Sequence, residues 1–259
     1  MKISVLIENT TRDPALQPEH GLSLYIETGG LRLLFDTGAT GAFAENAQKL
    51  GIDLSKVDAL ILSHGHYDHG GGIETFLHCN DSASVYVSAQ AFGDHYNGAG
   101  KYIGLPRNLQ DHPRLIPVTD RITLAPGITL DPCLQKAPQY PPEPFGLQVQ
   151  KEGRFYPETF DHEVYLIVEE EKRICFSGCA HRGVENILHW FQPDLLVGGF
   201  HLKQLSLDDP RLDLTAQRLK QNSCQYYTCH CTGQEQYDYL KRQLGEQLSY
   251  LSTGDVITL

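Results

Sequence analysis

The chain has 259 residues, a hydrophobic content of 41% and a formal net charge of -11. This length accommodates one large or two small domains, and the composition is that of an ordinary globular protein rather than a disordered one. The acidic balance and the lack of a Lys/Arg cluster argue against a nucleic-acid partner, which needs a basic surface for its phosphates.

The N-terminus and the cysteines bear on where the protein works. Residues 1–5 combine one lysine with a short apolar run, which is the pattern of neither a secretory signal nor a transmembrane span. The 7 cysteines are odd in number and irregularly spaced, which argues against a disulfide framework. We therefore expect a cytoplasmic protein without a membrane partner, and a homo-oligomer stays open.

Short apolar runs predict strands at the start of the chain, over 3–7, 22–27 and 31–35, the last two joined in a hairpin at Gly29-Gly30. Helical spacing follows over 41–50, and the apolar run 57–62 has the length of a buried strand. A helix over 73–79 and strands over 84–87, 115–118, 122–124 and 128–130 come next. Antiparallel strands thus open a fold in which helices and strands then mix.

Two segments lack regular periodicity. The segment 97–113 is a long irregular loop, and such a loop in a compact domain is usually functional, so we predict a lid over the active site. Within it, Lys101 and Arg107 are candidates for contact with an anionic substrate. The Pro-rich run 132–144 cannot be a regular element, and we interpret it as an ordered excursion within a single domain that spans 1–259.

In the second half, predicted strands repeatedly end at a histidine or cysteine. A hairpin of strands over 164–168 and 173–176 has His162 before it and Cys179-Ala180-His181 after it. A strand over 194–197 ends near His201, and one over 225–228 ends at Cys229-His230-Cys231. In a strand-like segment these two cysteines would point away from the side that His230 faces. Helices over 184–191, 214–221 and 235–244 and strands over 248–251 and 256–259 complete the chain.

The stretch His64-Gly65-His66-Tyr67-Asp68-His69, followed by Gly70-Gly71-Gly72, predicts a metal-binding turn between a strand and a helix. His64 and His66 are two apart in an extended segment, so both imidazoles face one side and can bind one cation. Asp68 and His69 follow where the chain turns and would face a second cation. The three glycines allow the backbone to turn tightly.

The pattern His64-x-His66-x-Asp68-His69 after a hydrophobic strand resembles the signature of the metallo-β-lactamase fold superfamily. The resemblance implies an α+β fold, a four-layer αβ/βα sandwich that holds one or two metal ions between its two β-sheets. Asp36, in Phe35-Asp36-Thr37-Gly38, matches the first motif of the superfamily, where the acidic residue supports the metal-binding loop from behind.

Further ligands follow from the same resemblance. His162 stands where the superfamily places a histidine and is the expected third donor to the metal at His64 and His66, while His230 is expected to close the second site. Cys179 occupies the position where most of the superfamily has a bridging aspartate and the lactamases have a cysteine that binds the second metal. A thiolate favours zinc, so we expect one or two zinc ions, with manganese or iron as alternatives.

Three more histidines are candidates for roles at the site. His181, two residues after Cys179, either replaces that cysteine as a ligand or acts as a proton shuttle, and we assign catalytic roles to Asp68 and His181. His201, at a predicted strand end, and His20 are expected to contact the substrate.

Zinc lowers the pKa of bound water to about 7, and a second cation stabilises charge that develops on an oxyanion. We therefore expect a hydrolase that acts on a small anionic metabolite. The runs 177–183, 198–202 and 230–233 also resemble one subfamily, the proteins named as 7,8-dihydropterin-6-yl-methyl-4-(β-D-ribofuranosyl)aminobenzene 5′-phosphate synthases. That resemblance implies, as an alternative, a transferase that joins a dihydropterin diphosphate to an aminobenzene ribotide. A non-catalytic metal- or ligand-binding protein is the third hypothesis.

Overall fold

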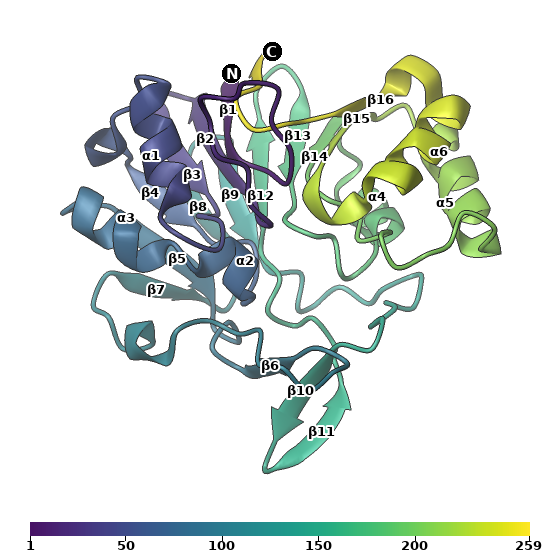
Figure 1. Cartoon of the computed structure of the whole chain (residues 1–259), viewed down its shortest axis with the longest axis horizontal. Coiled ribbons are helices and arrows are strands. Elements are labelled where there is room, and N and C mark those ends of the chain that lie inside the picture. The colour runs from purple at the N-terminus through teal and green to yellow at the C-terminus, as the bar shows by residue number, and fades with distance from the viewer.

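Two seven-stranded sheets form the centre of the computed structural model, which describes all residues from 1 to 259 (Figure 1). The first sheet has, in spatial order, the strands β17 (Val256–Thr258), β1 (Lys2–Ile7), β2 (Ser23–Thr28), β3 (Leu31–Phe35), β4 (Ala59–Ile61), β5 (Ser84–Ser88) and β7 (Leu115–Val118). The second has β16 (Leu248–Tyr250), β15 (Gln225–Thr228), β14 (Leu195–Val197), β13 (Arg173–Phe176), β12 (Tyr165–Glu169), β9 (Ile128–Asp131) and β8 (Ile122–Ala125).

Each sheet is antiparallel on one side and parallel on the other. In the first sheet β1, β2 and β3 pair antiparallel, whereas β4 joins β3 in parallel and β5 and β7 continue so. In the second, β12 pairs antiparallel with β13, and β14, β15 and β16 then follow in parallel. The parallel strands end at the same edge of each sheet, which is where the predicted ligands follow them.

The two sheets pack face to face through alternate residues of their strands. The ring centroids of Phe35 on β3 and Phe176 on β13 are 6.0 Å apart, and both side chains are fully buried. Val5 and Leu24 of the first sheet and Leu166 of the second belong to the same apolar core. Because side chains alternate between the faces of a strand, the neighbouring residues point outward, toward the helices.

Helices cover both outer faces, so the order of layers is αβ/βα, as predicted (Figure 1). On the first sheet lie α1 (Ala42–Lys49), α2 (Tyr67–Gly70) and α3 (Ile73–Cys79), and on the second lie α4 (Val184–Phe191), α5 (Pro210–Gln221) and α6 (Gln234–Leu244). Helix α5 begins earlier than predicted, because Asp209 caps it through the Arg211 amide and Pro210 occupies its first turn. No helix is long and apolar enough to cross a membrane.

A small third sheet was not predicted from the sequence. It consists of β6 (Asp94–Tyr96), β10 (Gln148–Lys151) and β11 (Arg154–Pro157), with β10 in the middle, and lies at the end of the molecule opposite the termini (Figure 1). Strands of three or four residues give too short a pattern for a period of two to be recognised.

The Pro-rich segment 132–144 has no regular element, as predicted. Side chains of α4 and of the loop before it hold this segment by hydrogen bonds. The buried Arg182 donates to the carbonyl oxygens of Pro132 and Cys133, and Asn186 bonds both backbone groups of Tyr140. These contacts hold the segment beside the loop that carries Cys179.

Candidate metal centre

The candidate ligands, and Asp36 behind them, come from four loops that follow strands of the two sheets. Asp36 follows β3, His64 follows β4, Cys179 follows β13 and His230 follows β15. In the turn after β4, an added Cβ on Gly71 would collide with the carbonyl oxygen of Ala39. The loop after β3 thus approaches the metal turn so closely that glycine is required there.

Asp36 organises the metal turn from behind, as predicted. It is fully buried; its Oδ1 accepts from the amide of Ser63 at 2.7 Å, and its Oδ2 accepts from the Ser63 hydroxyl at 2.6 Å. The same Oδ2 lies 2.6 Å from Nδ1 of His69. The proton of His69 is therefore on Nδ1, which leaves a lone pair on Nε2.

His69, His230 and Cys179 form one group of donors. Nδ1 of His230 lies 2.8 Å from the side-chain oxygen of Asn9, so this imidazole also offers its Nε2. The two Nε2 atoms are 3.2 Å apart, and Sγ of Cys179 is 3.2 Å from Nε2 of His69. Oδ2 of Asp68 is 3.4 Å from Nε2 of His230. Lone pairs that face one another at this distance fit a shared cation, and the nitrogen, sulfur and oxygen donors suit zinc.

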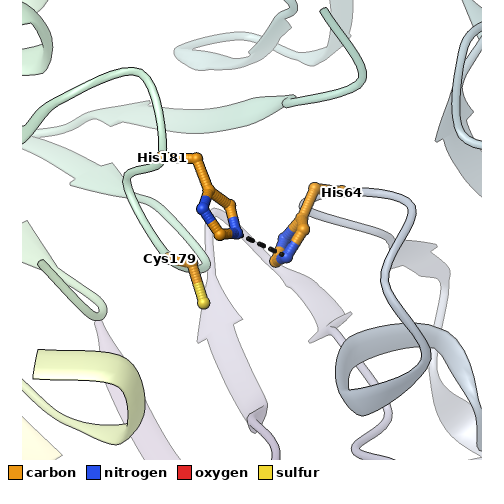
Figure 2. A group of neighbouring side chains, drawn as sticks. All are labelled: His64, Cys179 and His181. Carbon is orange, nitrogen blue, oxygen red and sulfur yellow. Dashed lines mark hydrogen bonds between the residues drawn. The ribbon is translucent and has the colours of Figure 1, made fainter. Parts of the chain in front are cut away.

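A second group contains His64 and His181. Their Nε2 atoms are 3.3 Å apart, and Figure 2 shows the two rings facing each other from different loops, with Cys179 beside them. The centroids of the His64, His66 and His181 rings are 4.6, 4.9 and 5.0 Å apart, pair by pair, at angles of 75° to 82°. His64, His181 and Cys179 offer ligand atoms within 4.8 Å of one another, and the His66 ring lies beside them; such a set fits a cation that keeps an open position.

Burial keeps most of these imidazoles neutral, which is the form that binds metal. Desolvation lowers the pKa of His66 to about 3 and holds the pKa values of His64 and His181 well below the ordinary value. Burial opposes the charge of Asp68, but the hydrogen bond with His230 and the neighbouring imidazoles outweigh it, so the pKa of Asp68 lies below its usual range. Burial raises the pKa of Cys179, so a nearby cation is needed to stabilise its thiolate.

Cys231 corrects one interpretation of the sequence. Cys229 lies in the core between the sheets, as expected, but Cys231 lines the site, with its Sγ 3.6 Å from the carbonyl oxygen of Cys179. The reason is local, because His230–Thr232 is a 3-10 turn (η3) and not a strand, so alternation does not apply. His230 itself has a φ of 49°, a left-handed conformation that a non-glycine residue adopts at a cost of free energy.

The centroid of the His162 ring lies 5.8 Å from that of His64 and 5.0 Å from that of His66. One ring nitrogen each of His66, His95 and His162 forms a separate group within 4.8 Å, and all three rings are buried. The role of His162 as the third ligand stays a prediction, and His181 occupies the position beside His64. His95 was missed because it belongs to the short strand β6 and matches no motif.

A polar cavity opens over the donors. Two predicted substrate contacts, His20 and His201, line it, but Lys101 and Arg107 do not. Arg107 pairs with Asp94, and Nζ of Lys101 lies 5.6 Å from the centre of the Tyr67 ring, which is itself part of the lining. The predicted lid does reach the cavity, through Asn97 and Ile103. The exposed cation of the lining is Lys203, which the sequence interpretation missed because a lone lysine carries no signal.

Comparisons with known proteins agree with the fold. A family model described as the metallo-β-lactamase superfamily matches residues 16–217. The chain is 28% identical to the 7,8-dihydropterin-6-methyl-4-(β-D-ribofuranosyl)-aminobenzene-5′-phosphate synthase of Methanocaldococcus jannaschii, over 92% of this chain and 90% of that protein. It is 27% identical to an uncharacterized protein of the same organism, over 89% and 90%. The crystal structure of Tm1679, a metal-dependent hydrolase of the β-lactamase superfamily, is 27% identical, covers 100% of this chain and 99% of its own, and superposes with a TM-score of 0.83.

Proposed function

We propose that this chain, which belongs to the metallo-β-lactamase superfamily, is a zinc-dependent hydrolase that acts on a small anionic metabolite. The observation that carries the proposal is the convergence of buried imidazoles, Cys179 and the ionised Asp68 at one polar cavity. Bound divalent cations would supply a water of lowered pKa and positive charge opposite a developing oxyanion.

The protein groups have distinct tasks in this proposal. His64, His66 and His181 hold the first cation, and the donors around His69 hold the second. His162 would join the first set only in its other tautomer, without the hydrogen bond from the amide of Gly65. Oδ2 of Asp68 is placed to accept a proton at the edge of the cavity. Nε2 of His20, 3.4 Å from that oxygen and half-exposed, is placed to exchange the proton with solvent.

The cavities support a substrate with two chemically different parts. Lys203 contributes positive charge to the polar cavity above the donors. A second, more apolar cavity, with Phe145, Phe200 and Leu205 in its wall, adjoins the first, because His181 and His201 line both. A small anion with an apolar or aromatic portion would fill the two together.

A synthase activity is the second candidate, and the similarity to the M. jannaschii synthase over most of both chains favours it. The same cations would then assist the departure of diphosphate from a pterin substrate rather than attack by water. The two activities differ in whether a second substrate is needed for turnover.

The test uses purified protein that is stripped of metal and reloaded separately with zinc, manganese or iron. We expect zinc-dependent cleavage of at least one class of phosphodiester, phosphomonoester, ester or thioester, and loss of that cleavage in His69→Ala. His189→Ala, at an exposed position of α4, is the matched control. Turnover only when a dihydropterin diphosphate and an aminobenzene ribotide are both present would favour the synthase. Metal binding without any turnover would favour a binding protein.

A further inference from the structure

A group of buried nitrogens behind the metal turn has no partner. Nε2 of His66, of His95 and of His162 is buried without a hydrogen bond. The centroids of the His95 and His162 rings are 4.1 Å apart, and each lies within 5.7 Å of the His66 ring. Because unpaired polar atoms are costly in a protein interior, the protonation of this cluster needs an explanation.

The small third sheet brings His95 and Glu158 together. His95 lies on β6 opposite Val149 of β10, and Glu158 directly follows β11, the other neighbour of β10. Nδ1 of His95 is 2.7 Å from Oε2 of Glu158, and both side chains are buried. The proton of His95 is therefore on Nδ1, and its Nε2 offers a lone pair to the cluster.

His162 has the opposite tautomer. The amide of Gly65 donates to Nδ1 of His162 at 3.0 Å, so the proton of this ring is on Nε2. That atom faces Oε1 of Glu158 at 3.8 Å. A nitrogen that carries a proton is not a metal ligand, which argues against a cation shared by the three rings. Gly65 lies between His64 and His66, so its hydrogen bond connects His162 to the metal turn.

His66 completes the network. It lines the polar cavity, and the ring nitrogen that is buried on the far side is Nε2, which leaves Nδ1 for the cavity. We propose that His95 and Glu158, with His162 beside them, are positioning residues for His66. In this structure both Nε2 atoms lack a hydrogen-bond partner; with a cation on His66 Nδ1, His95 Nε2 would accept the Nε2 proton of His66 and keep the lone pair of that ring on Nδ1. The proposal rests on the metal binding of the proposed function, but not on hydrolysis.

The test measures metal affinity rather than turnover. Zinc dissociation constants come from competition with a chromogenic chelator, and cobalt-substituted protein gives a visible spectrum that reports ligand geometry. His95→Leu removes the hydrogen bond with Glu158 and the acceptor that we propose for His66, and is expected to weaken zinc at the first site about tenfold to hundredfold, the usual effect of losing an outer partner of a ligand. His95→Gln keeps one acceptor and one donor and is expected to retain most of the affinity and the wild-type cobalt spectrum.

Two further variants complete the design. Glu158→Gln preserves the size of the side chain but no longer fixes the tautomer of His95, so an intermediate loss of zinc affinity is expected. This variant also tests the proposal if His95→Leu fails to fold. His189→Leu, at an exposed position, is the control.

At saturating zinc, every variant should bind as many ions as the wild type. Loss of one ion in His95→Gln would make His95 a ligand, and unchanged affinity in both His95→Leu and Glu158→Gln would make the cluster merely structural. Either result overturns the proposal, whatever the protein hydrolyses.

Discussion

In the proposed two-cation site, Cys179 is the residue on which binding of the second cation should depend most. Its Sγ lies 3.2 Å from Nε2 of His69, and its pKa is raised by burial, so its thiolate needs a cation beside it. We predict that Cys179→Ala releases one ion per chain while His64 and His66 retain the other. Cys179→Asp should restore two ions, with less preference for zinc over manganese, because a carboxylate is a harder ligand.

The measurement for Cys179 is metal content per chain after dialysis against each metal. Cys175→Ala is a suitable control, because Cys175 is also fully buried but lies on β13 away from the donors. Equal metal content in wild type, Cys179→Ala and Cys179→Asp would show that the thiol is structural, and the ligand role would then pass to His181.

Buried histidines should make the metal-free protein sensitive to acid. Burial lowers the pKa of His66 to about 3 and that of His201 to about 4, from an ordinary value of 6.5. Below about pH 6.5 the unfolded chain therefore binds protons that the folded protein does not, so the free energy of unfolding falls as the pH falls toward 4. Urea titrations at several pH values should show a shallower decline for His201→Asn than for wild type. His189→Asn, at an exposed position, is the control and should decline like wild type. An equally steep decline in wild type and in His201→Asn would contradict the role of buried His201 in the acid sensitivity.

At the scale of elements, two loops are alternative candidates for contact with an anionic substrate. Lys203 follows β14 and lines the polar cavity, whereas Lys101 and Arg107 belong to the predicted lid and lie outside the lining. We predict that Lys203→Ala raises KM for an anionic substrate by up to about fivefold, because an exposed ion pair contributes about 1 kcal/mol at most. The effect should shrink at high salt.

The double variant Lys101→Ala/Arg107→Ala is the comparison for Lys203→Ala. A rise in its KM that is larger than that of Lys203→Ala would restore the lid as the main anion contact. An unchanged KM would contradict the substrate role predicted for Lys101 and Arg107 and leave Arg107 as the partner of Asp94.

At the scale of the whole molecule, we propose that residues 1–259 fold as one unit. Glu8, fully buried just after β1, accepts hydrogen bonds from the amide of His230 and the hydroxyl of Tyr250, both at 2.7 Å. Strand β17, the last of the chain, pairs with β1. These ties join the two halves around the metal site, so neither half can unfold without exposing the core of the other.

Cooperative unfolding is the corresponding prediction. Far-UV circular dichroism follows all the strands and helices, while the fluorescence of Trp190 reports α4 alone. The two signals should change at the same denaturant concentration. Two separate transitions would show that the chain divides, with the Pro-rich segment 132–144 as the boundary to test first.

The sequence by itself predicted the sandwich, which the structure confirms, and named the main candidate ligands. The core strands are short, nearly continuous apolar runs, as expected for strands that are buried on both faces, and such runs can be recognised in the sequence. His64, His66, Asp68 and His69 lie within one turn, so their proximity is fixed by local geometry alone. Cys179 and His230 were expected from the resemblance to the superfamily, and the structure places each of them just after a strand of the second sheet.

Only the tertiary structure decided how the remaining groups pair. His95 and Glu158 are 63 residues apart and meet through strands too short to show a pattern. His181 faces His64 across 117 residues, and Lys203 reaches the cavity from a loop without any motif. The orientation of Cys231 depends on a 3-10 turn that ends a strand. In each case the contact is set by how distant segments pack, and residue spacing along the chain carries no information about that packing.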